Sequence, residues 1–233
     1  MVKPMELNQI ASMIDQTLLK PNATPEQIRV FCEEAKQYPF AAVCINPLYV
    51  SLAAGILEGT GTKVASVAGF PLGATPSRIK AAESVQAIRN GALEVDMVLP
   101  VGFLIAGDLK AVADDIRRVD EACKEENPDV ITKVIFENCL LTPDQIRAAC
   151  DAAMQTGVDY IKTSTGFSTG GARVEDVCLM KACVGDSKKV KAAGGIRDLA
   201  TLLAMKEAGA SRIGTSAGLA IIREAAALSK FPK

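Results

Sequence analysis

Short apolar runs alternate with longer amphipathic segments along most of the chain. The short runs have the length of buried strands, whereas the longer segments repeat apolar residues every three or four positions, as helices with one buried face do. Strands are predicted at residues 14–19, 40–45, 64–67, 94–99, 131–136, 160–163, 189–192 and 212–214. Helices are predicted at about 24–36, 47–57, 78–90, 108–126, 143–156, 174–184, 199–208 and 217–228.

Eight strand–helix units in succession are typical of a closed (β/α)8 barrel. The chain of 233 residues has the size of one such barrel, and no low-complexity segment or long linker interrupts it. We therefore expect an α/β fold in which residues 1–233 form a single TIM-barrel domain. The amphipathic segment 6–13, before the first strand, predicts a short N-terminal helix that acts as a lid.

Two of the predicted helices begin with the same motif. Thr24-Pro-Glu-Gln27 and Thr142-Pro-Asp-Gln145 each combine a threonine cap, a proline in the first turn and a glutamine three residues after the cap. The motif is either a good helix start used twice or a sign that the two halves of the chain are equivalent. Equivalence would align Cys44 with Lys162 and predicts that the Cys44 side chain points to the barrel mouth.

Composition narrows the class of protein. The chain has 26 basic and 27 acidic residues, a net charge of -1 and 49% hydrophobic residues, so we expect neither a nucleic-acid nor a membrane partner. Seven cysteines without a C-x-x-C pair indicate reduced thiols and a cytoplasmic protein. The lack of histidine excludes histidine-based triads and HExxH zinc sites. We expect a small-molecule partner and neither a metal nor a cofactor.

Two lysines lie at the ends of predicted strands and are followed by glycine turns. Lys162 precedes Gly166, and Lys191 precedes Gly194-Gly195. A lysine acts as a nucleophile when it is neutral, and both burial and a second ammonium group lower its pKa. The pair indicates a Schiff-base enzyme, although either lysine alone could simply reach solvent.

Other candidate residues fall at the same end of the predicted barrel. Active sites of such barrels form at the carboxyl ends of the strands, where Asp15, Cys44 and Asp96 join the two lysines. Asp96 interrupts an apolar run and needs a cationic partner, because burying an unpaired carboxylate is costly. It is either half of a structural pair with a lysine or, with Lys191, part of a proton relay.

Small residues after the last three strands predict a phosphate site, because glycines let backbone N–H groups approach an anion. The candidates are Gly166, Gly194, Gly195, Gly214 and Ser216. Glu137 and Lys133 share strand parity and predict a structural ion pair inside the barrel. Lys188-Lys189 is expected at the solvated surface.

Seven motifs occur in order from Ile14 to the last helix. They are Asp15-x-Thr-Leu-Leu-Lys20, Val43-Cys-Ile-Asn-Pro47, Gly69-Phe-Pro-Leu-Gly-Ala74, Glu94-Val-Asp-Met-Val98, Tyr160-Ile-Lys-Thr-Ser-Thr-Gly-Phe-Ser-Thr-Gly-Gly171, Lys191-Ala-Ala-Gly-Gly-Ile-Arg197 and Arg212-Ile-Gly-Thr-Ser216. In these motifs the chain resembles the deoxyribose-phosphate aldolases, a class I, Schiff-base family. The resemblance implies a metal-free barrel that reversibly cleaves 2-deoxy-D-ribose 5-phosphate to D-glyceraldehyde 3-phosphate and acetaldehyde.

The resemblance also implies residue roles and partners. Lys162 would form the imine, Asp96 and Lys191 would move protons, Asp15 would hold Lys191, and Cys44 would lie near the substrate. The phosphate would rest on Gly166, Gly194, Gly195, Gly214 and Ser216. The expected partners are a small phosphosugar, its aldehyde products and further copies of the chain in a dimer or tetramer.

Some positions depart from the pattern of the family, and rival functions remain. Gln16 stands where many members carry histidine, Asn138 where threonine is frequent and Phe167 where others have lysine, and the carboxyl end lacks a terminal tyrosine. The rivals are another Schiff-base barrel, such as a transaldolase or a sugar-bisphosphate aldolase, and a phosphosugar-binding protein without activity. A bisphosphate enzyme would need a second anion site, whereas the glycine loops lie on one side only.

Overall fold

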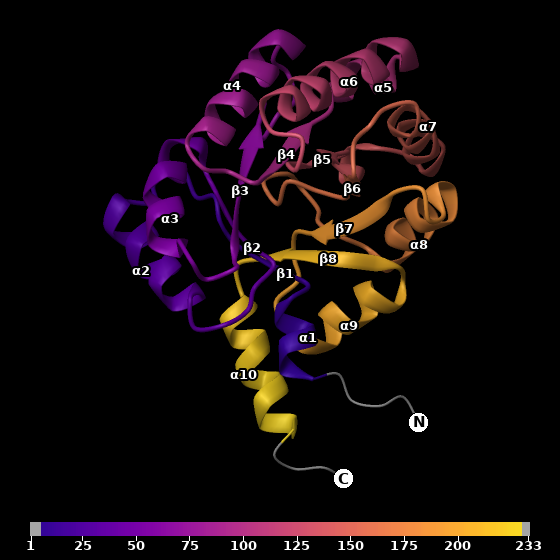
Figure 1. Cartoon of the computed structure of the whole chain (residues 1–233). Helices are drawn as coiled ribbons and strands as arrows, with labels where there is room; N and C mark the ends of the chain where they lie inside the picture. Colours follow the sequence, from indigo (N-terminus) through magenta and orange to yellow (C-terminus); the bar gives the residue numbers. More distant parts are fainter. Residues whose placement is uncertain (1–5, 230–233) are drawn as a thin grey trace.

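The computed structural model describes residues 6–229 and contains a closed barrel of eight parallel strands in chain order. The first strand pairs with the second and with the eighth, which closes the barrel. Helices surround the strands on the outside (Figure 1). The strands are β1 (Ile14–Leu18), β2 (Ala42–Ile45), β3 (Lys63–Ala68), β4 (Glu94–Val98), β5 (Ile131–Ile135), β6 (Tyr160–Lys162), β7 (Lys189–Ala193) and β8 (Ala210–Thr215).

The helices confirm the predicted alternation. They are α1 (Leu7–Ala11), α2 (Pro25–Ala35), α3 (Val50–Leu57), α4 (Ser77–Arg89), α5 (Val101–Ile105), α6 (Leu109–Glu126), α7 (Pro143–Met154), α8 (Val174–Val184), α9 (Leu199–Glu207) and α10 (Gly218–Ser229). Two differences concern prolines. A 3-10 turn, Pro47–Tyr49, precedes α3, and the short α5, which was not predicted, starts directly after Pro100. In both places the fixed φ of proline favours a helical turn.

The main hydrophobic core lies between the strands and the helices. Outward-facing strand residues such as Val43, Met97 and Ile213 are fully buried against the helix layer. A second, smaller cluster lies inside the barrel around β2 and β3 and includes Cys44 and Val67. Buried charged side chains, among them Asp96, Lys133 and Lys191, meet in another part of the interior. The barrel interior is therefore apolar on one side and ionic on the other.

The N-terminal helix is present, but its predicted role as a lid is wrong. Only two residues separate α1 from the amino-terminal end of β1, so a five-residue helix lies at the end of the barrel opposite to the strand carboxyl ends. Its residues Ile10 and Ala11 are buried, and it packs beside α10 (Figure 1). The carboxyl-terminal residues 230–233, where the sequence lacks the family tyrosine, are outside the described part of the chain.

The two similar helix starts form the same structure. In α2 the Thr24 hydroxyl accepts from the Gln27 N–H at 3.2 Å, and the Gln27 side chain accepts from the Thr24 N–H at 2.9 Å. The reciprocal pair recurs between Thr142 and Gln145 at 3.3 and 2.9 Å. Both helices thus have complete capping boxes. Within residues 6–229, no helix is both long and apolar enough to cross a membrane.

Candidate active site

Three lysines donate hydrogen bonds to one buried aspartate at the centre of the barrel. Lys162 Nζ lies 2.7 Å and Lys191 Nζ 2.6 Å from the same oxygen of Asp96, Oδ2. Lys133 Nζ lies 2.8 Å from the other oxygen, Oδ1. All four side chains are at most 3% exposed. Two amines thus lie within hydrogen-bond distance of one carboxylate oxygen.

Strand register explains this convergence. Asp96 on β4 is in register with Lys133 on β5, and Lys162 on β6 is in register with Lys191 on β7. Residues in register on parallel strands point to the same face, which here is the interior of the barrel. The predicted meeting of Asp96 with both strand-end lysines is therefore present in the structure.

A second layer of charges supports the first. Arg212 on β8 donates from Nε to Asp15 Oδ1 at 2.8 Å and from Nη2 to Glu94 Oε2 at 2.7 Å. Glu94 also accepts from Lys133 at 2.5 Å. Asp15 in addition forms an ion pair with Lys191, the contact that the family resemblance implied. Lys191 is therefore held by two carboxylates, those of Asp15 and Asp96.

The charges of this network do not balance when every group is ionised. Four basic side chains face three acidic ones, which leaves a surplus of one positive charge. The basic groups are Lys133, Lys162, Lys191 and Arg212, and the acidic groups are Asp15, Glu94 and Asp96. A buried cluster with a net charge is costly, and the loss of one proton from a lysine would neutralise it.

The environment favours Lys162 as the group that loses this proton. Burial lowers the pKa of Lys162, and the charge of Lys191 lowers it further, against the opposing effect of Asp96. Burial also lowers the pKa of Lys191, but the charges of Asp15 and Asp96 outweigh this effect and raise the pKa of that lysine above its usual value. The pKa of Asp96 lies well below its usual range because its three lysine partners outweigh burial. Lys191 and Asp96 are therefore charged at neutral pH.

Cys44 points into the barrel interior, but it does not line the cavity at the barrel mouth, where the predicted equivalence with Lys162 placed it. Its thiol is fully buried and feels the charges of Lys191, Asp96 and Lys162. Burial raises the pKa of the thiol, and the two ammonium groups only partly offset this effect. Cys44 is therefore a neutral thiol on the apolar side of the interior, next to the amines.

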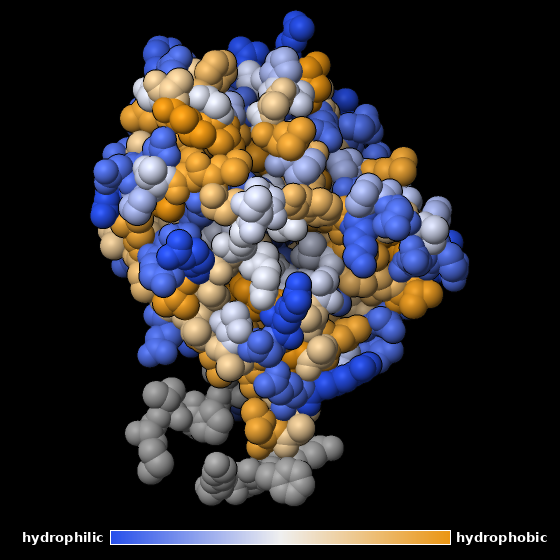
Figure 2. Space-filling model, turned by 180° about the vertical axis from the view of Figure 1, so that it is seen from behind, coloured by the Kyte–Doolittle hydropathy of each residue, from blue (hydrophilic) through white to orange (hydrophobic). Residues whose placement is uncertain are grey.

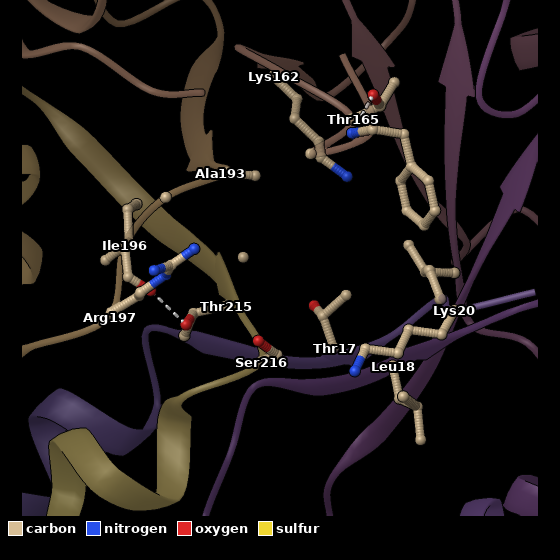
Figure 3. Close-up of a pocket in the computed structure, with 16 residues that line it drawn as sticks. Thr17, Leu18, Lys20, Lys162, Thr165, Ala193, Ile196, Arg197, Thr215 and Ser216 are labelled. Atoms are coloured by element: carbon tan, nitrogen blue, oxygen red, sulfur yellow. Dashed lines mark hydrogen bonds between the residues drawn. The ribbon is translucent and has the colours of Figure 1, made fainter. Parts of the chain in front are cut away.

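A cavity of about 430 Å³ opens above Lys162 at the carboxyl ends of the strands (Figure 3). The predicted phosphate residues all line it: Gly166, Gly194, Gly195, Gly214 and Ser216. Figure 3 shows the Lys162 amine directed into this space, with Ser216 and Thr215 on the far side. The predicted nucleophile and the predicted anion loops thus share one cavity.

Two glycines in this region are required by close contacts. A Cβ atom on Gly171 would lie 2.3 Å from the carbonyl oxygen of Gly194, so the two loops approach each other through bare backbone. A Cβ on Gly214 would lie 3.2 Å from the Lys191 Cε. Gly214 therefore leaves room for the lysine side chain as well as lining the cavity.

Sequence reasoning missed several residues of the cavity wall. Thr17, Lys20 and Thr165 line it although they were not among the predicted site residues. Lys20 and Arg197 bring positive charge to the wall, and in Figure 3 the Lys20 amine reaches toward the open space below Thr17. The position of Lys20 just after a strand end was the available signal for it.

Two predicted placements are wrong. Glu137 does not pair with Lys133, because its left-handed backbone (φ 60°) turns the side chain out of the strand alternation. Lys133 instead pairs with Glu94 and Asp96, the carboxylates on the neighbouring strand. Lys188 is 8% exposed rather than solvated. Its amine donates to two backbone carbonyl oxygens at 2.9 and 2.7 Å.

Gln16, at the position where histidine is frequent, does not enter the barrel interior. Its Oε1 accepts a hydrogen bond from the Gly218 N–H at 2.9 Å, and the side chain is 2% exposed. It thereby ties β1 to the start of α10. Within residues 6–229, no three cysteine or carboxylate side chains are grouped as metal ligands would be.

Comparisons with known proteins agree on one family. The model of the family described as "DeoC/LacD family aldolase" matches residues 9–224. A deoxyribose-phosphate aldolase of Brevibacillus brevis is 54% identical over 209 residues, which cover 90% of this chain and 93% of that protein. One of Carboxydothermus hydrogenoformans is 51% identical over 215 residues, covering 92% and 94%.

Solved structures give the same result. The aldolase QR15 superposes with a TM-score of 0.90 at 37% identity, over 96% of this chain and 99% of that one. The deoxyribose phosphate aldolase of Aeropyrum pernix, whose structure is described as a unique tetramer, has a TM-score of 0.88 at 32% identity. That match covers 96% of this chain and 93% of the other.

Proposed function

The chain belongs to the DeoC/LacD family of aldolases, and from this premise we propose that it reversibly cleaves 2-deoxy-D-ribose 5-phosphate to D-glyceraldehyde 3-phosphate and acetaldehyde. The observation that carries the proposal is that Lys162 and Lys191 share one oxygen of Asp96, while Lys162 also lines a glycine-rich cavity. We further propose that residues 1–233 act as a single aldolase domain.

Lys162 is the proposed nucleophile. Its neutral amine attacks the aldehyde carbon of the open-chain sugar, and the carbinolamine that forms loses water to give a protonated imine. Burial and the charge of Lys191 lower the pKa of Lys162, which favours the neutral amine that this step needs. Lys191 keeps its proton at neutral pH and can donate it, directly or through water, as the hydroxyl group leaves.

The imine then acts as an electron sink for the cleavage. Asp96, directly or through water, accepts the proton of the hydroxyl on the third sugar carbon, and the bond between the second and third carbons breaks. This step releases D-glyceraldehyde 3-phosphate and leaves the enamine of acetaldehyde on Lys162. Protonation of the enamine carbon and hydrolysis of the imine release acetaldehyde and restore the amine.

The phosphate group is assigned to the wall of the cavity opposite to the apolar interior cluster. Backbone N–H groups around Gly166, Gly194 and Gly195 and the hydroxyl of Ser216 can approach its oxygens, and Lys20 adds positive charge. The other side of the interior is formed by Ala42, Val67 and their neighbours and has no comparable anion-binding groups. This asymmetry supports a substrate with one phosphate over a sugar bisphosphate.

The test is trapping of the covalent intermediate. Incubation with acetaldehyde and borohydride should convert Lys162 to N-ethyl-lysine, because hydride reduces the imine carbon, and peptide mass spectrometry locates the modified residue. The Lys162→Met variant should remain unlabelled and should not cleave 2-deoxy-D-ribose 5-phosphate. Labelling at another lysine would contradict the mechanism, and absence of cleavage by the unmodified protein would contradict the substrate.

The remaining proposals concern the setting of the enzyme. We infer that it acts in the cytoplasm, which is supported by seven free cysteines, three of them at least partly exposed. We also infer a homo-oligomer, either a dimer or a tetramer. Exposed apolar side chains on the outer surface support this inference, as does the tetrameric structure described for the relative from Aeropyrum pernix.

A further inference from the structure

The turn after β5 contains an unusual backbone conformation. Glu137 has φ 60° and ψ 59° and is the only non-glycine residue with positive φ among residues 6–229. A glutamate is disfavoured there because its Cβ crowds the backbone, and such a conformation persists only where the surroundings fix it. The side chain is also 3% exposed, although it has no cationic partner within the described residues. Glu137 is thus strained, buried and unused by the proposed chemistry.

The carboxylate of Glu137 binds the loop that follows Lys162. Oε1 accepts from the Thr165 N–H at 3.2 Å, and Oε2 accepts a short hydrogen bond from the Thr165 hydroxyl. The Thr165 hydroxyl oxygen in turn accepts from the Phe167 N–H at 3.0 Å. These three contacts hold the residues on both sides of Gly166.

The backbone on either side of Glu137 is attached to the same region. The Phe136 N–H donates to the carbonyl oxygen of Lys162, and the Asn138 N–H donates to that of Thr163, both at 2.9 Å. Glu137 therefore lies between the two backbone hydrogen bonds that connect the end of β5 to the end of β6. Its left-handed conformation is what aims the carboxylate at Thr165 while both neighbours keep these backbone bonds.

We propose that Glu137 is a positioning residue for the aldol reaction, which holds the loop of residues 163–167 at a fixed place relative to the Lys162 amine. The loop carries Gly166, one of the residues assigned to the phosphate, so the inference rests on the proposed function. Glu137 does not line the cavity and acts through Thr165, which does. By holding this loop, Glu137 would set the distance between the phosphate-binding loop at Gly166 and the imine on Lys162. This distance must match the length of the sugar.

The test compares a phosphorylated with an unphosphorylated substrate. In Glu137→Gln the amide cannot accept from both Thr165 donors, so the loop loses a charge-assisted hydrogen bond. We expect KM for 2-deoxy-D-ribose 5-phosphate to rise about tenfold, the effect of losing one such bond. The kcat/KM for 2-deoxy-D-ribose, which has no phosphate to place, should stay within about twofold of the unmodified enzyme. Damage to the fold alone would lower both values together.

Glu83→Gln is the matched control. Glu83 is partly buried and, like Glu137, accepts a backbone N–H, that of Gly69 at 2.8 Å, but Gly69 and the residues that follow it do not line the cavity. This variant undergoes the same chemical change. It should leave the ratio of the two kcat/KM values unchanged.

A second pair of variants gives a result even if Glu137→Gln does not fold. Thr165→Val removes the hydroxyl that links Glu137 to Phe167, whereas Thr165→Ser retains it. Because Thr165 lines the cavity, we expect Thr165→Val to raise KM for the phosphorylated substrate by a larger factor than KM for 2-deoxy-D-ribose, and Thr165→Ser to reduce this difference. Combining Glu137→Gln with Thr165→Val should add little to either single change, because both break the same link.

Two results would overturn the inference. One is an equal loss for both substrates in Glu137→Gln and in Thr165→Val, and the other is an unchanged KM for the phosphorylated substrate in both. Neither result resembles failure of the proposed function, in which the unmodified enzyme itself would cleave neither substrate.

Discussion

Lys162 owes its proposed reactivity to its neighbours rather than to its own chemistry. It belongs to a buried network with four basic and three acidic groups, so one proton too many is present when all are ionised. Lys191 is held in the charged state by Asp15 and Asp96, whereas burial and Lys191 lower the pKa of Lys162. The surplus proton is therefore most easily lost from the amine that lines the cavity.

Removal of this amine should stabilise the protein while abolishing activity. A basic group whose pKa is lowered by folding binds its proton more weakly in the folded than in the unfolded state, which costs stability at every pH below its unfolded pKa of about 10.4. In Lys162→Met the three remaining cations balance the three carboxylates. We expect the free energy of unfolding at pH 7 to rise by about 1 kcal/mol or more. Such a gain in stability at the expense of activity is common when active-site residues are replaced.

The pH dependence distinguishes this explanation from better packing by methionine. The advantage of Lys162→Met should shrink as the pH rises through the lowered pKa of the folded-state lysine, and it should vanish above the unfolded pKa of about 10.4, where the lysine is neutral in both states. Urea unfolding of both proteins at pH 7 and pH 9.5 measures it. A difference that does not change with pH would show that deprotonation of Lys162 is not its source.

The second amine should control the first. Lys191→Leu removes a positive charge next to Lys162 and should therefore raise the pKa of Lys162, which shifts the acidic limb of the kcat/KM profile to higher pH. It also removes a proton donor, so we expect activity to fall by about 10² to 10⁴. The profile of kcat/KM against pH, together with the rate of borohydride trapping, measures both effects. Lys36→Leu, at a surface lysine paired with Glu33, is the control.

At the scale of elements, one buried ion pair joins two helices to the barrel. Lys80 on α4 is fully buried and donates to Asp115 on α6 and to the carbonyl oxygen of Val98 at the end of β4, both at 2.8 Å. Burial raises the pKa of Asp115 and lowers that of Lys80, so each group depends on the other for its charge. The pair fixes how α4 and α6 pack together.

Breaking this pair on one side should be worse than removing it altogether. We expect Lys80→Met alone to lower the free energy of unfolding by about 3–5 kcal/mol, because it leaves Asp115 buried without its partner. The double variant Lys80→Met with Asp115→Leu should recover most of that loss. Urea unfolding of the three proteins measures the difference. A double variant less stable than the single one would contradict it.

The elements could be predicted from sequence because their signals are local. Periodicity located all eight strands, and the capping boxes at Thr24 and Thr142 located two helix starts. The short α5 was missed because five residues are too few to show a helical period. The lid was misassigned because amphipathicity reveals a buried face but not the end of the barrel on which that face lies.

Sequence predicted most residues of the candidate site, but it did not predict all of the contacts between charged side chains. Strand-end position and glycine turns indicated Lys162, Lys191 and the glycine loops that line the cavity. The partner of Lys133, however, depends on how neighbouring strands are staggered around the barrel. The partner of Glu137 depends on its left-handed backbone conformation. Sequence did not indicate this conformation, because glycine or asparagine usually occupies such a position.

At the scale of the whole molecule, the outer surface is not uniformly polar. Figure 2 views the molecule from behind the view of Figure 1 and shows apolar groups toward the top. Figure 1 places α4, α5 and α6 in that part of the molecule. Large apolar side chains are exposed in and near these helices. They are Leu72, Ile79, Phe103 and Ile105, between 49% and 75% exposed. A group of exposed apolar side chains of this kind often marks a surface at which proteins associate.

A charge placed in this group should disrupt the proposed oligomer. Phe103→Glu introduces a carboxylate that would have to be desolvated at an interface, so we expect the mass measured by light scattering to fall toward that of a 24.5 kDa monomer. Val30→Glu, at a 49% exposed position on α2, is the control. An unchanged mass in Phe103→Glu would place the interface elsewhere.

The network at the centre of the barrel also has a consequence for synthesis. Asp15 lies on the first strand of the barrel, and its two cationic partners, Lys191 and Arg212, lie on the last two barrel strands to leave the ribosome. A nascent chain therefore carries this carboxylate through most of translation without the groups that neutralise it. We therefore expect catalytic competence only after the final strand docks, since an incompletely translated chain would contain the proposed imine-forming lysine without the assembled network.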